Sequence, residues 1–212
     1  VDHVRAIRER GLAITGPIET FTQAMPACTP DAVTGLWDTI FLCVKALHTE
    51  AATRQLAPHL AADGVVVSLQ NGFNEIAIAE VVGAARTMGA FINFGADVMS
   101  PGVVHYGGRG AVVVGELDGR DSERLARVRR ALLHFEPAAI ATDNIWGYLW
   151  GKMGYGSLLF ASALTDASIV EVLDARDVRP ALTALAREVM AVAAAEAVPV
   201  MGFNGYDPAA FG

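Results

Sequence analysis

A lysine and a carboxamide each follow an apolar run, and together they have the chemistry to bind an anionic ligand. Lys45 comes directly after the run 39–44, and Gln70-Asn71-Gly72 follows the run 65–69. An ammonium group pairs with phosphate, and an amide offers donors and an acceptor. Ligands of open α/β sheets bind outside the carboxyl ends of the strands, where we expect both segments. The alternative is a surface lysine and a simple Asn-Gly turn.

A second lysine lies in a segment of aromatic residues and glycines. Lys152 is the basic residue of the segment 146–156, which carries Trp, Tyr and Gly on both sides of it. Aromatic neighbours desolvate and orient an ammonium group, whereas Gly151, Gly154 and Gly156 each cost a helix about 1 kcal/mol relative to alanine. Glycines kept at that cost indicate close packing or a ligand. The alternative is a packed aromatic helix whose lysine extends into water.

Other motifs of catalysis and cofactor binding are missing from the sequence. Gly108-Arg109-Gly110 lacks the third glycine of G-x-G-x-x-G, and Gly151-Lys152 has Trp146 where a P-loop needs glycine. No G-x-S-x-G elbow of a serine hydrolase is found. The five histidines form no i,i+4 pair, and Cys28 and Cys43 match no metal spacing, so we expect no metal site and two free thiols in a reducing compartment.

Composition excludes several classes of protein. The chain has 212 residues, of which 53% are hydrophobic and 18% charged, so it is too apolar for a disordered protein and long enough to bury a core. A formal net charge of −7 argues against a nucleic-acid binder. No apolar run reaches the roughly 18 residues that a membrane span needs. The sequence starts at Val1 and shows no leader, and we take the cytoplasm as the default location.

Strand and helix patterns alternate over the first part of the chain. The strands are expected at 12–15, 39–44, 65–69 and 88–94, and the helices at 4–10, 49–62 and 74–82, with a kink at Pro58 and a turn at Asp63-Gly64. Runs that are apolar without alternation are buried on both faces, as in parallel sheets. The order predicts a doubly wound α/β sheet. The segment 20–37 receives no assignment.

The pattern changes after residue 101. The segments 103–106 and 111–115 flank four residues rich in glycine, which predicts a β-hairpin, and an amphipathic helix follows at 121–135. Beyond residue 143 only helices are expected, at 145–165 and at 168–198 with a break near Arg179-Pro180. We therefore predict two domains, 1–143 and 144–212. The Ala-rich helix 181–197 is compatible with packing inside the chain or across a homodimer.

Taken in order, these segments resemble the ketopantoate reductase (2-dehydropantoate 2-reductase) family. The V-K, Q-N-G and W-x-K pieces are weak singly and specific in combination. The resemblance runs through nearly the whole chain, in the segments 3–7, 11–12, 41–45, 68–72, 101–104, 150–152 and 163–165. It implies a Rossmann-type cofactor domain followed by an all-α domain. It also implies an active site in the cleft between them and hydride transfer from NADPH to a 2-oxo acid.

The resemblance implies a role for each candidate residue. Lys45, Gln70, Asn71 and the main chain of Val98 would contact the cofactor, Asn71 would also touch the substrate, and Lys152 would be the general acid. Hydride addition to a ketone builds charge on oxygen, which a positioned ammonium stabilises and then protonates. An ordinary lysine, with a pKa near 10.4, is charged at pH 7.

The sequence departs from the family pattern in three respects. It begins after the first βα unit with its G-x-G-x-x-G turn, so the residues that choose NADP over NAD are not in view. It stops before the family's helical domain ends. The asparagines that the family places four and eight residues after the acid lysine are here Gly156 and Phe160, or Ser162 in the register set by Leu164-Thr165. We expect a substrate site at Gly156 and Phe160 that prefers a more apolar 2-oxo acid.

Two other functions stay open at this point. Without the asparagines, the protein is compatible with a nucleotide sensor that binds NADP and reduces nothing. Without the phosphate-binding turn, the 212 residues are also compatible with a piece that binds no cofactor by itself.

Overall fold

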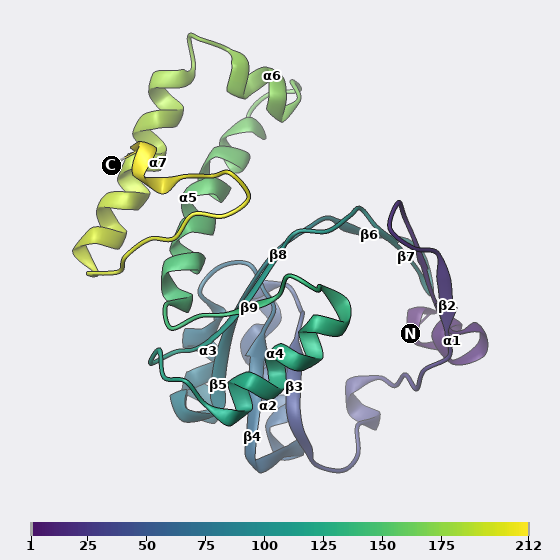
Figure 1. Cartoon of the computed structure of the whole chain (residues 1–212). Helices are drawn as coiled ribbons and strands as arrows, with labels where there is room; N and C mark the ends of the chain where they lie inside the picture. Colours follow the sequence, from purple (N-terminus) through teal and green to yellow (C-terminus); the bar gives the residue numbers. More distant parts are fainter. Residues whose placement is uncertain (1, 212) are drawn as a thin grey trace.

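The computed structural model describes residues 2–211 and contains two sheets and a helical part (Figure 1). The helices are α1 (Asp2–Arg10), α2 (Thr49–Leu56), α3 (Asn74–Val82), α4 (Glu123–Phe135), α5 (Ile145–Ser162), α6 (Ile169–Asp174) and α7 (Arg179–Ala195). The strands are β1 (Leu12–Thr15), β2 (Phe21–Gln23), β3 (Trp37–Leu42), β4 (Leu60–Ser68), β5 (Thr87–Asn93), β6 (Ala96–Ser100), β7 (Val103–Tyr106), β8 (Ala111–Glu116) and β9 (Ile140–Ala141). Within residues 2–211, no helix has both the length and the apolar character to cross a membrane.

The larger sheet has the strand order β3-β4-β5-β8-β9. Strands β3, β4 and β5 run parallel, joined by α2 and α3, and β8 pairs antiparallel with β5. The carboxyl ends of β3, β4 and β5 therefore lie along one edge, where the segments after 39–44 and 65–69 meet. The predicted α/β sheet is confirmed.

Helices cover both faces of this sheet. On one face α4 packs against alternate residues of β4, β5 and β8 in a core that contains Val65, Val67, Met88, Ala90, Val112, Val114, Leu125, Val128 and Leu132. On the other face α2 and α3 pack against β3 and β4, and α5 packs against β5 and β8 through Phe91, Val113, Ile145 and Leu149. This two-sided covering is the doubly wound arrangement that the sequence predicts.

The predicted hairpin of 103–106 with 111–115 is wrong, because its two strands belong to different sheets. β7 pairs with β6 and β1 in a smaller sheet of order β2-β1-β7-β6, whereas β8 pairs with β5. The turn into β7 is instead made from β6 at Pro101-Gly102, with Gly102 at φ +83°. The glycines between β7 and β8 let the chain pass close to the end of β5, where a side chain on Gly110 would overlap the Asn93 carbonyl.

Several element boundaries also differ from the prediction. α2 ends at Leu56, and Pro58 lies in a short 3₁₀ turn rather than in a kinked helix that continues to 62. Asp63-Gly64 makes no turn but lies inside β4, where the pairing register with β3 shifts. A Cβ on Gly64 would lie 2.8 Å from the Trp37 carbonyl oxygen, so glycine permits this bulge. The unassigned segment 20–37 contains β2, and 168–198 forms two helices, α6 and α7.

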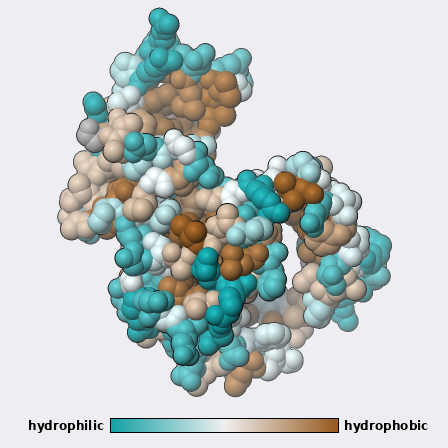
Figure 2. All heavy atoms as spheres, viewed as in Figure 1, coloured by the Kyte–Doolittle hydropathy of each residue, from teal (hydrophilic) through white to brown (hydrophobic). Residues whose placement is uncertain are grey.

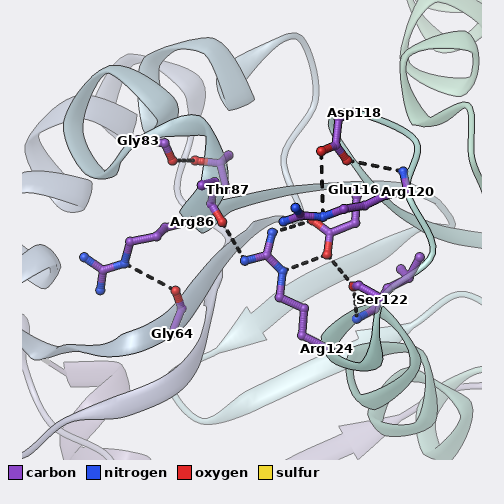
Figure 3. Close-up of polar contacts among 11 residues, drawn as sticks. Gly64, Gly83, Arg86, Thr87, Glu116, Asp118, Arg120, Ser122 and Arg124 are labelled. Atoms are coloured by element: carbon purple, nitrogen blue, oxygen red, sulfur yellow. Dashed lines mark hydrogen bonds and ion pairs between the residues drawn. The ribbon is translucent and has the colours of Figure 1, made fainter.

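The opposite edge of the sheet is held by a buried ion pair (Figure 3). The side chain of Glu116 at the end of β8 is 1% exposed, and Arg124 of α4 binds it with Nε 2.7 Å from Oε1 and Nη2 on Oε2. The Ser122 hydroxyl donates to the same carboxylate at 2.6 Å and accepts from the amide of Leu125, which caps α4. The pair thus fixes the start of α4 to the end of β8, beside the amino end of β5. A surface depression of about 500 Å³ opens beside it.

Close packing accounts for most of the glycines in α5. A Cβ on Gly147 would overlap the Pro199 carbonyl, one on Gly151 would overlap the Met201 carbonyl, and one on Gly154 would lie 2.5 Å from Met190 of α7. Around Gly156, in contrast, no atom of residues 2–211 lies within 4 Å of that position, apart from the neighbouring residues and the backbone of α5 itself. The sequence predicts close packing or a ligand at these glycines; the first applies to Gly151 and Gly154, and Gly156 borders open space.

Alanine substitutions in α5 are expected to have opposite effects on stability. Gly151→Ala forces a methyl group against a backbone carbonyl, which lowers the free energy of unfolding by about 2 kcal/mol. The methyl group of Gly156→Ala enters open space and alanine has the higher helix propensity, so this substitution should raise the free energy of unfolding by about 0.5–1 kcal/mol. Urea unfolding followed by circular dichroism measures both. Equal effects of the two substitutions would contradict the packing described here.

The domain boundary at 143 stays a prediction. β9 ends at Ala141 and α5 begins at Ile145, with Asn144 as its N-cap. α5 packs on α7 and also on β5 and β8, so it joins the helical part to the sheet.

Candidate active site at the carboxyl edge of the sheet

The loops that follow β3 and β4 are tied together. The amide nitrogen of Gln70 donates to the Val44 carbonyl at 2.7 Å and to the Thr49 hydroxyl at 2.8 Å. Gln70 is 7% exposed, so these hydrogen bonds lie below the surface of the two loops. Lys45 and Asn71 each follow one of the bonded residues and are exposed. The structure therefore brings the predicted lysine and carboxamide to one edge, as two neighbouring surface groups.

A short chain of hydrogen bonds fixes the Asn71 loop from below. The Asn74 amide donates to the Asn71 carbonyl at 2.7 Å, and the Thr49 hydroxyl donates to Asn74 Oδ1 at 3.0 Å. Gly72 has φ +96°, a left-handed conformation that glycine adopts readily. The Asn-Gly turn considered from the sequence is thus present. It leaves the side chain of Asn71 at the surface, so the turn and a binding role are compatible.

An aromatic contact connects α5 to this loop. The ring of Phe73 lies 4.7 Å from that of Trp150 and 6.3 Å from that of Trp146, measured between centroids. Phe73 immediately follows the Asn71-Gly72 turn, and Trp150 precedes Lys152 by two residues. Sequence reasoning did not single out Phe73, because an aromatic residue after a turn has no pattern of its own.

Lys152 extends from α5 to the carboxyl end of β5. Its ammonium donates a hydrogen bond to the Ile92 carbonyl and lies 5.3 Å from the centroid of the Phe91 ring. Burial lowers the pKa of Lys152 to about 8. The expectation of an ordinary lysine is therefore corrected, because partial removal from water disfavours the charged form. The group is still mostly protonated at pH 7.

The face of α5 beyond Lys152 is open and apolar. Gly156 and Phe160 follow Lys152 by four and eight residues, so they lie on the same side of the helix. Phe160 is 81% exposed and Leu164 is 88% exposed. Figure 2 shows a hydrophobic area over the end of the helical part, where α5 approaches α6. Such a surface offers contact to hydrocarbon and no amide.

Val98 does not join this group. It lies on β6 of the smaller sheet, paired with Val104 and 68% exposed. Cys28 and Cys43 are exposed free thiols. Among residues 2–211, no group of three or more His, Cys, Asp and Glu side chains is arranged to hold a metal ion.

Lysine usage is a signal that the sequence patterns left unused. The chain has 16 basic residues, of which only Lys45 and Lys152 are lysines and the other 14 are arginines. Arginine thus supplies most of the positive charge of the chain. Lys45 follows the carboxyl end of β3, and Lys152 reaches the carboxyl end of β5. An ammonium group can release a proton near neutral pH, and a guanidinium cannot.

The fold and this edge define a class of protein: an α/β protein of the Rossmann-like type, whose helical part brings a lysine to the carboxyl edge of the sheet. Residues 1–119 match the family model described as "Ketopantoate reductase PanE/ApbA". The chain belongs to this family.

Individual relatives agree with this assignment. The chain is 34% identical over 172 residues to a 2-dehydropantoate 2-reductase of Archaeoglobus fulgidus, a match that covers 80% of this chain and 54% of that protein. The crystal structure of a PanE/ApbA family ketopantoate reductase from Ralstonia eutropha JMP134 superposes with a TM-score of 0.82 at 26% identity, covering 95% of this chain and 66% of that one. D-mandelate dehydrogenase in a ternary structure with NADH and anilino(oxo)acetate shares the fold, with a TM-score of 0.78 at 21% identity over 99% of this chain and 67% of that one. The chain spans about half the length of the curated relatives it matches.

Proposed function

We propose that the protein is an NADPH-dependent reductase that converts a 2-oxo acid into the 2-hydroxy acid, with Lys152 as the general acid. One observation carries the proposal: a partly buried ammonium, held by the Ile92 carbonyl, extends to the strand edge where Lys45 and Asn71 are exposed. The family membership supports the reaction class, since the relatives that match over most of this chain are named 2-dehydropantoate 2-reductases.

The groups at this edge fit a nicotinamide dinucleotide. Lys45 provides a cation for phosphate, and Asn71 provides amide donors and an acceptor. Gln70 would act indirectly by holding the two loops together. Val98, on the smaller sheet, is not part of this proposal. When bound, the cofactor supplies the hydride. NADPH rather than NADH is proposed from the family resemblance, and the ratio of their kcat/KM values tests it.

Lys152 has the properties of a proton donor for this reaction. A ketone reduced at carbon develops negative charge on oxygen, which a nearby ammonium stabilises. With a pKa of about 8, Lys152 carries its proton at neutral pH and releases it more readily than an ordinary lysine. The hydrogen bond to Ile92 restricts where the nitrogen points, which leaves its other protons for a substrate.

The open apolar face of α5 supports a substrate with a hydrocarbon substituent. We expect kcat/KM for 2-oxo acids with branched or aromatic side chains to exceed that for ketopantoate by about tenfold or more, because this face has no group for a substrate hydroxyl. A panel of 2-oxo acids with increasing side-chain size measures the preference.

Gly156→Asn is expected to move that preference toward ketopantoate. The space at Gly156 admits a side chain, and an amide there could bind a hydroxyl, so the kcat/KM ratio of ketopantoate to an apolar 2-oxo acid should rise about tenfold. Gly156→Ala fills the same position without an amide and is the matched control. A wild-type preference for ketopantoate, or an equal effect of both variants, would rule out this assignment of the face.

A nucleotide sensor is the second candidate function. It is favoured by the apolar face of α5, since the half-buried Gly156 and the exposed Phe160 provide no polar contact to a substrate. Calorimetric binding of NADPH without its oxidation by any 2-oxo acid of the panel would favour the sensor. A cytoplasmic location and a homodimer stay predictions from the sequence.

A further inference from the structure

A buried acid lies beneath the candidate site and takes no part in the chemistry proposed above. Glu75, in the first turn of α3, is 0% exposed, and neither of its carboxylate oxygens has a hydrogen-bond partner within residues 2–211. The Ser68 hydroxyl at the end of β4 is likewise buried; it faces the carboxylate and lowers its pKa, although no hydrogen bond of ordinary geometry joins the two groups. Buried polar groups normally find partners, so an orphaned carboxylate requires an explanation.

Glu75 and Lys152 lie over the same face of β5. Met88 and Ala90 point toward α4, so Gly89 and Phe91, which alternate with them, point to the other face. A Cβ on Gly89 would lie 3.5 Å from Glu75 Cγ, and the Lys152 ammonium lies 5.3 Å from the Phe91 ring centroid. The two strand positions are roughly 7 Å apart. Ile92, whose carbonyl accepts from the Lys152 ammonium, is three residues beyond Gly89, so the carboxyl group lies on the order of 10 Å along the strand from the ammonium.

The groups that contact Glu75 within residues 2–211 carry no charge. The group that faces Glu75 from β4 is the Ser68 hydroxyl, β5 presents Gly89 and α5 presents Ile145. From α2, Thr49 binds the neighbouring Asn74. No ion pair to Glu75 occurs within residues 2–211. In this poorly solvated layer a charge acts over a longer distance than in water.

We propose that Glu75 is a positioning residue that acts through Lys152: its carboxylate holds the ammonium in the protonated form that the reaction requires. Burial raises the pKa of Glu75 to about 7, so the acid is largely ionised in the range where Lys152 begins to lose its proton. The functional meaning rests on the reductase activity proposed above, whereas the coupling of the two charges does not.

The two lysines of the chain allow a direct test. Reductive methylation with ¹³C gives dimethyl-lysine signals from Lys45 and Lys152 alone, apart from the terminal amine, and Lys45→Arg assigns them. In Glu75→Gln the titration midpoint of Lys152 should fall by about half a pH unit to one unit. Glu80→Gln removes an exposed acid from the same helix and should leave the midpoint unchanged. An unchanged midpoint in Glu75→Gln would overturn the proposal.

Two further measurements keep the proposal testable. If Glu75→Gln does not fold, the Lys152 signal of the wild-type protein must show a second inflection near pH 7 from Glu75, and a single inflection rejects the coupling. In the natural gene product, the alkaline limb of kcat/KM should shift with the Lys152 midpoint. A shifted midpoint in a protein that reduces no 2-oxo acid would refute the proposed function and leave the coupling in place.

Discussion

Lys152→Ala is expected to lower kcat for 2-oxo acid reduction about 10²–10⁴-fold, because the substrate oxygen loses both its proton donor and the charge that stabilises it. The KM for the cofactor should change little, since Lys152 lies on α5 and the cofactor groups follow β3 and β4. Steady-state oxidation of NADPH by the natural gene product, with the best 2-oxo acid of the panel, measures both constants.

Two variants separate proton donation from positive charge. Lys152→Arg keeps a cation that cannot release its proton at neutral pH, so it should stay nearly as slow as Lys152→Ala. Lys45→Ala should instead raise the KM for NADPH and leave kcat closer to that of the wild type. An alanine variant of Lys152 that turns over at the wild-type rate would disprove the acid assignment.

The pH dependence follows from the same assignment. A general acid works in its protonated form, so kcat/KM should be constant below the pKa of Lys152 and fall as the pH rises through about 8. The alkaline limb of the wild-type profile tests this. A fall that begins only near pH 10 would show that burial does not lower the pKa as the structure indicates.

The elements whose pattern is local were predictable from the sequence. Strands β4 and β5 are mostly buried apolar runs, and α4 has an apolar stripe and a serine N-cap, so each carries its own signal. The run at β3 was also expected to be buried on both faces, but β3 is the edge strand of the sheet and only its Leu42 is buried. Their alternation was enough to predict the sheet, and the carboxyl-edge rule then selected Lys45 and Asn71. Lys152 was found because its aromatic and glycine-rich surroundings are unusual for a helix.

Features that depend on contacts between residues distant in the sequence were not predictable. β7 and β8 are close in sequence and were assigned to one hairpin, but their partners are β1, β6 and β5, which no local pattern specifies. The bulge at Gly64 needs the approach of Trp37, and the orphaned state of Glu75 follows from burial by several elements. Phe73 likewise gains its role only when α5 packs against it.

Arg124→Ala is expected to have the largest effect on stability. Glu116 would stay buried beneath α4 without its bidentate partner, and breaking a buried pair in this way costs about 3–5 kcal/mol of unfolding free energy. Urea unfolding at pH 7 measures the loss. Arg127→Ala, which removes an exposed arginine from the same helix, should change stability by less than about 0.5 kcal/mol.

The loss of unfolding free energy in Arg124→Ala should be smaller in acid. This direction of the pH dependence identifies the Glu116 carboxylate as the cause of the loss. Burial alone would raise the pKa of Glu116, but the hydrogen bonds from Arg124 and Ser122 outweigh it, so the pKa lies below its ordinary value. The stabilisation by the pair is therefore fully present above the pKa of an unfolded glutamate, about 4.3, and is lost as the pH falls through the lower folded value. In Arg124→Ala the effect of burial on the pKa of Glu116 is no longer opposed by Arg124. Glu116 therefore takes up a proton more readily, and the loss of unfolding free energy becomes smaller as the pH falls.

The difference in unfolding free energy between wild type and variant could also be the same at pH 7 and pH 4. That result would mean that Arg124 stabilises α4 by packing and by its bond to the Ala85 carbonyl, and not through the charge of Glu116.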